Sequence, residues 1–223
     1  RHRARHPVTC PPRSSILMGL EHWDPERGKW LLYQSGAEHT EDCARHPFEA
    51  IPRRVFLDTN VLNLLVKHSE QVFEQAPISP TFDKTRAHDI EALMHVFQVG
   101  ARANWDILAS EKSLHEIRNT PDDDVRAELL DYAVQLVALP GQDSAYAANL
   151  GRQLIDAPFA AALPDLADRE LIGNAIGFDC DVFCTCDRRT IVRKRERLGQ
   201  LPIRVLTPVE WWADIKPWAG LWL

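Results

Sequence analysis

Residues 55–65 read VFLDTNVLNLL, where an apolar run ends in a carboxylate and apolar residues at helical spacing follow. A short buried strand that leads directly into a helix is typical of a parallel α/β sheet. Further apolar runs of strand length recur along the chain, and together they predict strands at 54–57, 105–109, 135–139, 181–185 and 203–206. Their near-continuous apolar character indicates strands that are covered on both faces.

Helices are expected between these strands, because apolar residues there recur at intervals of three and four positions. The predicted helices cover 61–66, 85–101, 111–119, 122–134, 145–155, 165–176, 188–198 and 208–215. Pro121 and the acids after it mark one of the helix starts. The alternation of strands and helices places the chain in the α/β class.

The 223 residues suit one domain with appendages. We expect a partly irregular N-terminal extension at 1–53, an α/β domain at 54–216 and a hydrophobic C-terminal tail at 217–223. Residues 1–17 carry four arginines and no acid, and the first methionine is Met18. Part of that stretch could therefore lie outside the native chain.

Composition favours a protein of the cytoplasm. No apolar run reaches about 18 residues, so no membrane span is expected, and no signal peptide is recognisable. The five cysteines are odd in number and irregular in spacing, which fits a reducing compartment better than a disulfide framework. A zinc site is a weaker interpretation of four side chains whose spacing matches no standard finger: His6, Cys10, Cys43 and His46.

Two of the predicted strands end in an acid. Asp58 follows the strand at 54–57, and Asp187 follows the strand at 181–185, with Thr185 two residues earlier. Ligands of open α/β sheets bind at the carboxyl ends of the strands, so both acids are candidates for chemistry. Each could equally be the N-cap of the helix that comes next.

Two further acids lie on predicted helices. Asp168 shares one helix face with the apolar residues that follow it, so its carboxylate should point along the buried side, where an unpaired charge is costly. A helix-start position behind an Asp165 cap explains the same residue without a ligand. Glu116 lies beside the apolar stripe of the helix at 111–119, and a lone glutamate of this kind is usually solvated.

The four acids together are more informative than any one of them. Carboxylates that converge on one edge of a sheet repel one another unless a cation is bound. Oxygen ligands without paired cysteine or histidine favour Mg²⁺ or Mn²⁺ over zinc. The formal net charge of −6 is compatible with a nucleic-acid substrate if such carboxylates hold cations. We therefore expect one divalent-metal site made by Asp58, Glu116, Asp168 and Asp187.

At these residues the sequence resembles the PIN-domain family, named after the PilT N-terminus. The similarity runs from about residue 54 to residue 212, in the segments VFLDTNVLNLL, ILASEKSLHEI, LADRELIGNAIGFDCDVFCTCD and IRVLTPVEWW. The resemblance implies a three-layer α/β/α sandwich with a central, mostly parallel sheet of about five strands. The family's four acids correspond, in order, to Asp58, Glu116, Asp168 and Asp187.

The resemblance also implies a Mg²⁺- or Mn²⁺-dependent endoribonuclease that hydrolyses RNA phosphodiester bonds. Asp58 and Asp168 would be direct metal ligands, and Asp187 would be a ligand or would hold a metal-bound water. Glu116 would be a ligand or would orient the attacking water. Many members are toxins of toxin–antitoxin pairs, which would bring an inhibitory partner protein, but the N-terminal extension, the long 67–84 segment and an extra helix depart from the short toxin pattern.

Asn60 and Thr185 would hydrogen-bond to the acids and orient them. Substrate binding could use Arg189, Arg193 and Arg197, which follow Asp187 at four-residue steps and would share one face of the predicted helix. These arginines are either a phosphate track or an ordinary solvated basic face.

Two alternatives stay open. A PIN-like fold can also be a catalytically silent RNA- or protein-binding module, although the presence of all four acids argues against a dead site. The hydrophobic residues near the C-terminus could pack on the chain's own core or form a homodimer or partner interface. These residues are Trp211, Trp212, Trp218, Leu221, Trp222 and Leu223.

Overall fold

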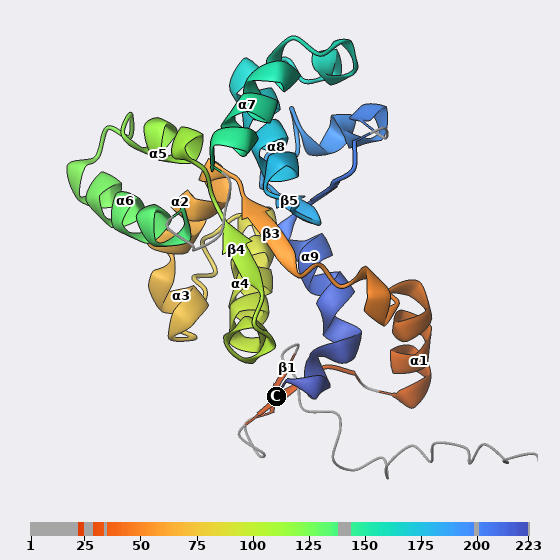
Figure 1. Ribbon diagram of the computed structural model, residues 1–223. Coiled ribbons are helices and arrows are strands. Elements are labelled where there is room, and N and C mark those ends of the chain that lie inside the picture. The colour runs from red at the N-terminus through yellow and green to blue at the C-terminus, as the bar shows by residue number, and fades with distance from the viewer. Residues whose placement is uncertain (1–21, 25–28, 34, 138–143, 199–200, 223) are drawn as a thin grey trace, which may run out of the picture.

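The computed structural model has a four-stranded parallel sheet at its centre, and it describes residues 22–24, 29–33, 35–137, 144–198 and 201–222. The strands, in spatial order, are β4 (Asp106–Leu108), β3 (Arg54–Leu57), β5 (Val182–Cys184) and β6 (Arg204–Leu206). Every neighbouring pair runs parallel. Figure 1 shows β3 and β4 side by side in the middle of the molecule. The α/β class expected from the sequence is confirmed.

The remaining elements are mainly helices. They are α1 (Gly36–Arg45), η1 (Phe48–Ala50), α2 (Thr59–Lys67), α3 (Ser69–Phe73), α4 (Lys84–Ala103), α5 (Glu111–Ile117), α6 (Asp123–Val137), α7 (Ser144–Ile155), η2 (Pro158–Ala162), α8 (Leu166–Gly177), η3 (Val192–Leu198), α9 (Pro208–Ile215) and η4 (Lys216–Leu221), where η marks a 3₁₀ segment. A two-stranded antiparallel hairpin, β1 (His22–Asp24) with β2 (Lys29–Leu31), lies outside the main sheet. In the described part of the chain, no helix combines the length and the apolar character that crossing a membrane requires.

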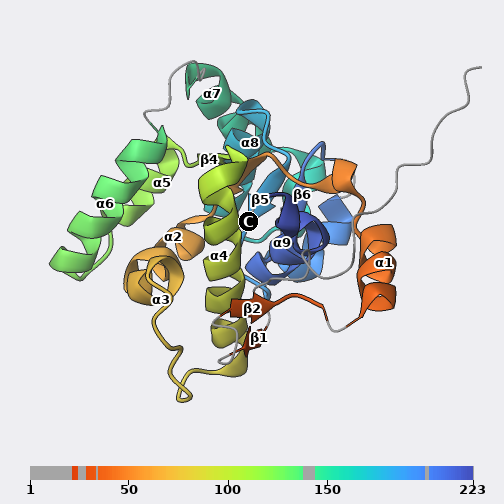
Figure 2. The same ribbon diagram turned by 90° about the horizontal axis from the view of Figure 1, so that it is seen from below.

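Helices cover both faces of the sheet. Successive side chains of a strand point to opposite faces, and here the side chains on both faces are apolar and buried. Val55 and Leu57 belong to one core cluster, which α2, α4, α6 and α9 complete. Phe56 faces the other way and stacks on Phe183, with ring centroids 5.6 Å apart, in a cluster completed by α7 and α8. Figure 2 shows α4 and α9 on one side and α7 and α8 on the other. The arrangement is compatible with three layers.

The predicted strand at 135–139 is wrong. Residues 135–137 complete α6, while 138 and 139 lie outside the described residues. A short apolar run does not distinguish a strand from the end of a buried helix, and here the run continues the helical spacing of Leu129 and Ala133, both fully buried. The central sheet therefore has four strands among the described residues, where about five were expected.

The predicted α-helix at 188–198 is also wrong. Residues 188–191 form turns, and the 3₁₀ segment η3 follows. The carboxylate of Asp187 accepts hydrogen bonds from the backbone N–H groups of Arg189 and Thr190, at 2.9 and 2.8 Å. These bonds hold the chain in a tight turn directly after β5, and a regular α-helix does not start there.

The residues before and after the sheet pack on one another. The Trp218 indole N–H donates to the backbone oxygen of His46, at 2.8 Å, and His46 Nδ1 lies 2.8 Å from a carboxylate oxygen of Asp214. Trp211 and Trp212 are buried, and the partly buried Trp218 and Trp222 pack on the same core cluster. These tryptophans therefore pack on the chain's own core, one of the two roles expected for them. Leu221 stays exposed, and Leu223 lies outside the described residues.

Candidate functional site

Asp58 lies at the carboxyl end of β3, the strand from which later strands are added first on one side and then on the other. The chain leaves β3, adds β4 on one side and later adds β5 on the other side, and ligands of open α/β sheets bind at the carboxyl ends of strands at such a switch point. The side chain is only 4% exposed. Although Asp58 stands at the N-cap position of α2, its carboxylate makes no capping hydrogen bond. A capping role therefore does not explain this acid.

A polar network holds the Asp58 carboxylate. Oxygen Oδ2 accepts hydrogen bonds from Thr185 Oγ1 at 2.6 Å and from Asn60 Nδ2 at 2.5 Å. Asn60 Oδ1 accepts from the Cys186 backbone N–H at 2.9 Å, and Thr185 Oγ1 accepts from the Asp187 N–H at 3.0 Å. Asn60 and Thr185 thus tie the end of β3 to the end of β5 and orient Asp58.

Glu116, a residue of α5, lies near Asp58. Its Oε2 accepts a hydrogen bond from Thr59 Oγ1 at 2.7 Å, and its Oε1 lies 3.7 Å from Lys112 Nζ. Oxygen Oε1 is buried and has no hydrogen-bond partner among the described residues. The side chain is 24% exposed, so Glu116 is not the freely solvated glutamate expected of a lone acid on a helix. A buried, unsatisfied carboxylate oxygen is a candidate ligand for a cation.

Asp168 lies in the first turn of α8. The expected helix cap is confirmed, because Asp165 Oδ1 accepts from the Ala167 N–H at 2.9 Å. Asp168 itself is half-buried, and among the described residues its carboxylate makes no hydrogen bond or ion pair. Burial, and then the negative charges nearby, raise its pKa to about 7. The neighbouring acids are Asp58, Asp165, Asp187 and Glu116.

Asp187 is held differently. Besides the two backbone N–H groups in the turn after β5, Thr190 Oγ1 donates to its Oδ2. Partial burial acts to raise its pKa, but the hydrogen bonds from Thr190 and Arg189 outweigh that effect and leave the pKa below its ordinary value. Asp187 is therefore a turn cap that is ionised near neutral pH, and its negative charge acts on Asp168.

The four predicted acids are brought to one edge of the sheet. Burial raises the pKa of Asp58 to about 6, and the charge of Glu116 adds to the rise, while the hydrogen bonds from Thr185 and Asn60 oppose it. Among the described residues, however, no group of three or more His, Cys, Asp or Glu side chains is close enough to hold a metal ion. The donor set fits a hard divalent cation chemically, but side chains would have to rotate to gather three of these carboxylates around one ion.

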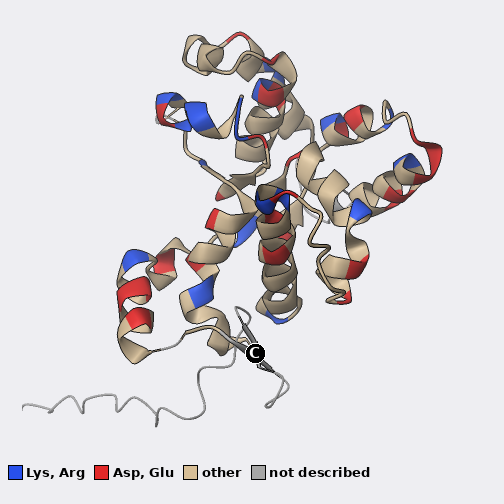
Figure 3. Cartoon of the chain, turned by 180° about the vertical axis from the view of Figure 1, so that it is seen from behind, with Lys and Arg blue, Asp and Glu red and all other residues tan. Residues whose placement is uncertain are grey.

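The proposed phosphate track lacks its geometric basis. Arg189, Arg193 and Arg197 are all exposed. They lie in a turn and in a 3₁₀ segment, where side chains align every three residues rather than every four. Figure 3 shows basic residues along this segment, but their spacing does not place the three arginines on one face.

The zinc alternative gains no support. His6 and Cys10 lie outside the described residues. Cys43 Sγ lies 3.3 Å from His39 Nε2, whereas the ring of His46 contacts Asp214.

Four charged residues near the site were not singled out from the sequence: Lys112, Glu170, Arg188 and Asp89. Lys112 lies 3.5 Å from Glu170 as well as near Glu116, and its i, i+4 spacing to Glu116 could have revealed that pair. Arg188 binds Asp89 of α4 with two hydrogen bonds. Asp89 is 99 residues away in sequence, and no local pattern indicates that contact.

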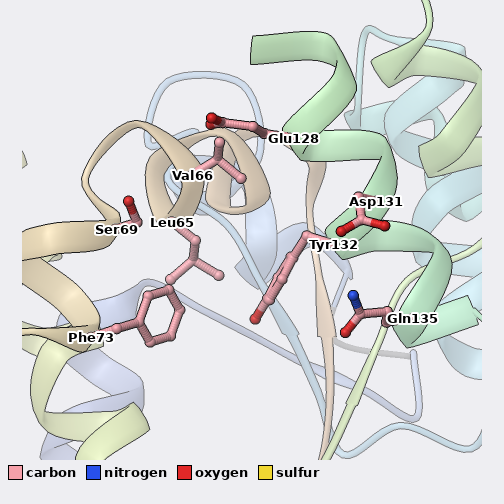
Figure 4. Close-up of a pocket in the computed structure, with 8 residues that line it drawn as sticks. All are labelled: Leu65, Val66, Ser69, Phe73, Glu128, Asp131, Tyr132 and Gln135. Carbon is pink, nitrogen blue, oxygen red and sulfur yellow. The ribbon is translucent and has the colours of Figure 1, made fainter. Parts of the chain in front are cut away.

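One cavity lies away from these acids. It has a volume of about 310 Å³ and is lined by residues of α2, α3 and α6. Leu65, Phe73 and Tyr132 line it together with the acidic Glu128 and Asp131 (Figure 4). Burial raises the pKa of Tyr132 to about 12, so its hydroxyl stays protonated at neutral pH. None of the four candidate acids lines this cavity.

Comparison with protein-family models, with curated proteins and with solved structures finds no match for this chain. Its function must therefore be inferred from the geometry and charge of the site.

Proposed function

We propose that this chain is a PIN-like, divalent-metal-dependent nuclease that hydrolyses phosphodiester bonds in RNA. The proposal is carried by buried carboxylates at one edge of the sheet: Asp58 is 4% exposed, and Glu116 Oε1 is buried without a hydrogen-bond partner among the described residues. In line with this, burial and the charges of the neighbouring acids raise the pKa of Asp168 to about 7. Ionised carboxylates that lie close together repel one another, and a bound cation relieves that repulsion. A toxin role, and the inhibitory partner that would accompany it, rest on the sequence resemblance alone.

Each residue of the site has a separate role in this proposal. When bound, Mg²⁺ or Mn²⁺ supplies an activated water and a counter-charge for the phosphate. Asp58 and Asp168 would hold the cation, and Asn60 and Thr185 keep the Asp58 carboxylate in one orientation through bonds of 2.5 and 2.6 Å to Oδ2. Glu116, whose Oε1 is buried and unsatisfied, would hold the cation or orient the attacking water. Asp187, ionised and fixed in its turn, adds negative charge that attracts the cation.

A cleavage assay tests the proposal. Labelled single-stranded RNA and DNA oligonucleotides are incubated with the protein and Mg²⁺, Mn²⁺ or a chelator. We expect metal-dependent cleavage of RNA that Asp58→Asn abolishes. The matched control is Asp106→Asn, which removes an exposed acid paired with Arg54 at the opposite edge of the sheet. Cleavage by Asp58→Asn at the wild-type rate with Mn²⁺ would contradict the assignment.

A catalytically silent binding module is the second candidate function. Two observations favour it: three ligands are not gathered around one point, and Lys112 already offers Glu116 a positive charge. Retained RNA binding without cleavage under every metal condition would support this candidate.

A further inference from the structure

A cavity with several charged and polar residues in its wall lies next to Glu116, because Lys112 of its lining is 3.7 Å from that acid. It has a volume of about 360 Å³ and forms where α5, α7 and α8 meet, elements that lie next to one another in Figure 1. The size falls in the range of roughly 300–1,000 Å³ that is usual for ligand sites. Its lining includes Ser110, Lys112, Arg152, Glu170 and Asn174.

Lys112 joins this cavity to the candidate metal site. Its ammonium group lies 3.5 Å from Glu170, which lines the cavity, and 3.7 Å from Glu116, which belongs to the acid cluster. Both contacts are longer than a good hydrogen bond, so neither carboxylate holds the lysine tightly. Any cation bound by Glu116 would repel Lys112 towards the cavity.

Arg152 supplies a second positive charge on the cavity wall. It is exposed on α7, and it makes no hydrogen bond or ion pair with any other described residue. A guanidinium group of this kind can bind a phosphate through two parallel N–H groups. In a chain with a net charge of −6, an arginine that has no acidic partner in the described part of the chain and lies beside a candidate active site favours an anionic ligand there.

Buried polar atoms complete the cavity. Asn174 is 2% exposed, and its Nδ2 donates to Ser110 Oγ at 3.0 Å. Its Oδ1 is buried without a hydrogen-bond partner among the described residues. Gly151 leaves room for that oxygen, since a Cβ at this position would lie 2.2 Å from it. This oxygen therefore faces the backbone of α7, and Asn174 helps to hold α7 and α8 together at the cavity wall.

We propose that this cavity binds the nucleotide next to the cleaved bond of a single-stranded RNA substrate. Arg152 and Lys112 contact its phosphate, while the bonded pair Asn174 and Ser110 forms a buried part of the cavity wall. Glu170, 3.5 Å from the Lys112 ammonium group, would have to give up that contact for a phosphate to bind Lys112. This inference rests on the proposed ribonuclease function, because it assigns the cavity to the substrate of the same site.

Fluorescence anisotropy with a short, fluorescein-labelled single-stranded RNA tests the inference. A chelator is present, so that the RNA stays intact. We expect Arg152→Ala to weaken binding by about threefold to fivefold, as for the loss of one exposed charge pair. The slope of log affinity against log salt concentration should fall in magnitude by about 0.7, the value for one phosphate contact on a single strand.

Arg53→Ala is the matched control. Arg53 is an exposed arginine at the amino end of β3, the opposite edge of the sheet from the acids. We expect it to leave both the affinity and the salt slope unchanged. Equal values for wild type and Arg152→Ala, or equal losses in both variants, would overturn the assignment of the cavity. The absence of RNA binding by wild type would overturn it as well.

The same RNA incubated with wild type and Mn²⁺ separates the two proposals. Cleavage without any effect of Arg152→Ala on binding would leave the nuclease proposal standing and remove the substrate cavity. RNA binding that depends on Arg152, with no cleavage, would contradict the nuclease proposal and retain the cavity as an RNA-binding site.

Discussion

Asp89, 3% exposed on α4, holds Arg188 with two hydrogen bonds of 2.7 Å each. Arg188 directly follows Asp187, so this ion pair fixes the loop after β5 from the side of α4. On the other side, Asn60 binds the same loop through the backbone of Cys186. The position of Asp187 is therefore determined by contacts to two helices that are far from it in sequence.

Removing the arginine should destabilise the protein. Arg188→Ala leaves the buried Asp89 without its partner, and breaking a buried pair on one side costs about 3–5 kcal/mol. Because Arg188 is 35% exposed, we expect the lower end of that range. Urea unfolding at neutral pH measures the loss. The control is Arg193→Ala, which removes an exposed side chain that has no hydrogen-bond partner among the described residues. It should change the free energy of unfolding by less than about 0.5 kcal/mol.

The close packing of α7 on α8 should tolerate no added methyl group. A Cβ on Gly173 would lie 2.7 Å from Gly151 Cα, which is backbone and cannot rotate away. Gly173→Ala should therefore lower the free energy of unfolding by about 1–3 kcal/mol through overpacking, despite the better helix propensity of alanine. Thermal unfolding checks this prediction. Gly36→Ala, where no atom lies within 4 Å of the added Cβ, should not lower the melting temperature.

The metal-free protein should lose stability at this site as the pH rises. The pKa of Asp168 is about 7 in the folded chain against an ordinary value of 3.8, so the folded state binds the proton more tightly than the unfolded state. Protonated Asp168 therefore contributes to the free energy of unfolding in full below about pH 4, and this contribution is lost as the pH rises through 7. Asp168→Asn cannot ionise and should be more stable than wild type at pH 8, by about 2 kcal/mol.

Denaturant unfolding of both proteins between pH 4 and pH 8 measures this difference. The two proteins should differ least at the acidic end and most at the alkaline end. A difference that does not change with pH would show that Asp168 has an ordinary pKa in the folded chain.

Lys112 should compete with a divalent cation for Glu116. Its ammonium group lies 3.7 Å from Glu116 Oε1, and removing that charge should tighten Mn²⁺ binding, by about threefold to tenfold. Isothermal titration of Lys112→Met with Mn²⁺ at pH 8 measures the change. Asp58→Asn should abolish the binding heat. Unchanged or weaker Mn²⁺ affinity in Lys112→Met would contradict the competition.

Much of the fold could be predicted from local patterns. The strand at 54–57 and the helix at 208–215 have the expected bounds, because a fully buried strand and a capped amphipathic helix both leave signals within a few residues. The failures at 135–139 and 188–198 are also local. An apolar run at the end of a helix resembles a strand, and the side chain of Asp187 captures the N–H groups that an α-helix would use.

The candidate site was less accessible to sequence reasoning. The four acids could be selected because two end strands and two lie beside apolar stripes, and the structure brings them within electrostatic reach of one another. Their partners could not be selected in the same way. The contacts from Lys112 to Glu170 and from Arg188 to Asp89 depend on how helices pack across the sheet, which no short stretch of sequence encodes.

The hydrogen bond from Thr185 to Asp58 spans 127 positions of the chain. During synthesis on the ribosome, Asp58 leaves the exit tunnel long before Thr185 and Asp187 have been translated. A nascent chain therefore carries an incomplete set of acids until the residues through Asp187 have emerged and β5 has paired with β3. If the protein cuts RNA, this delay would protect the messenger from which it is being translated.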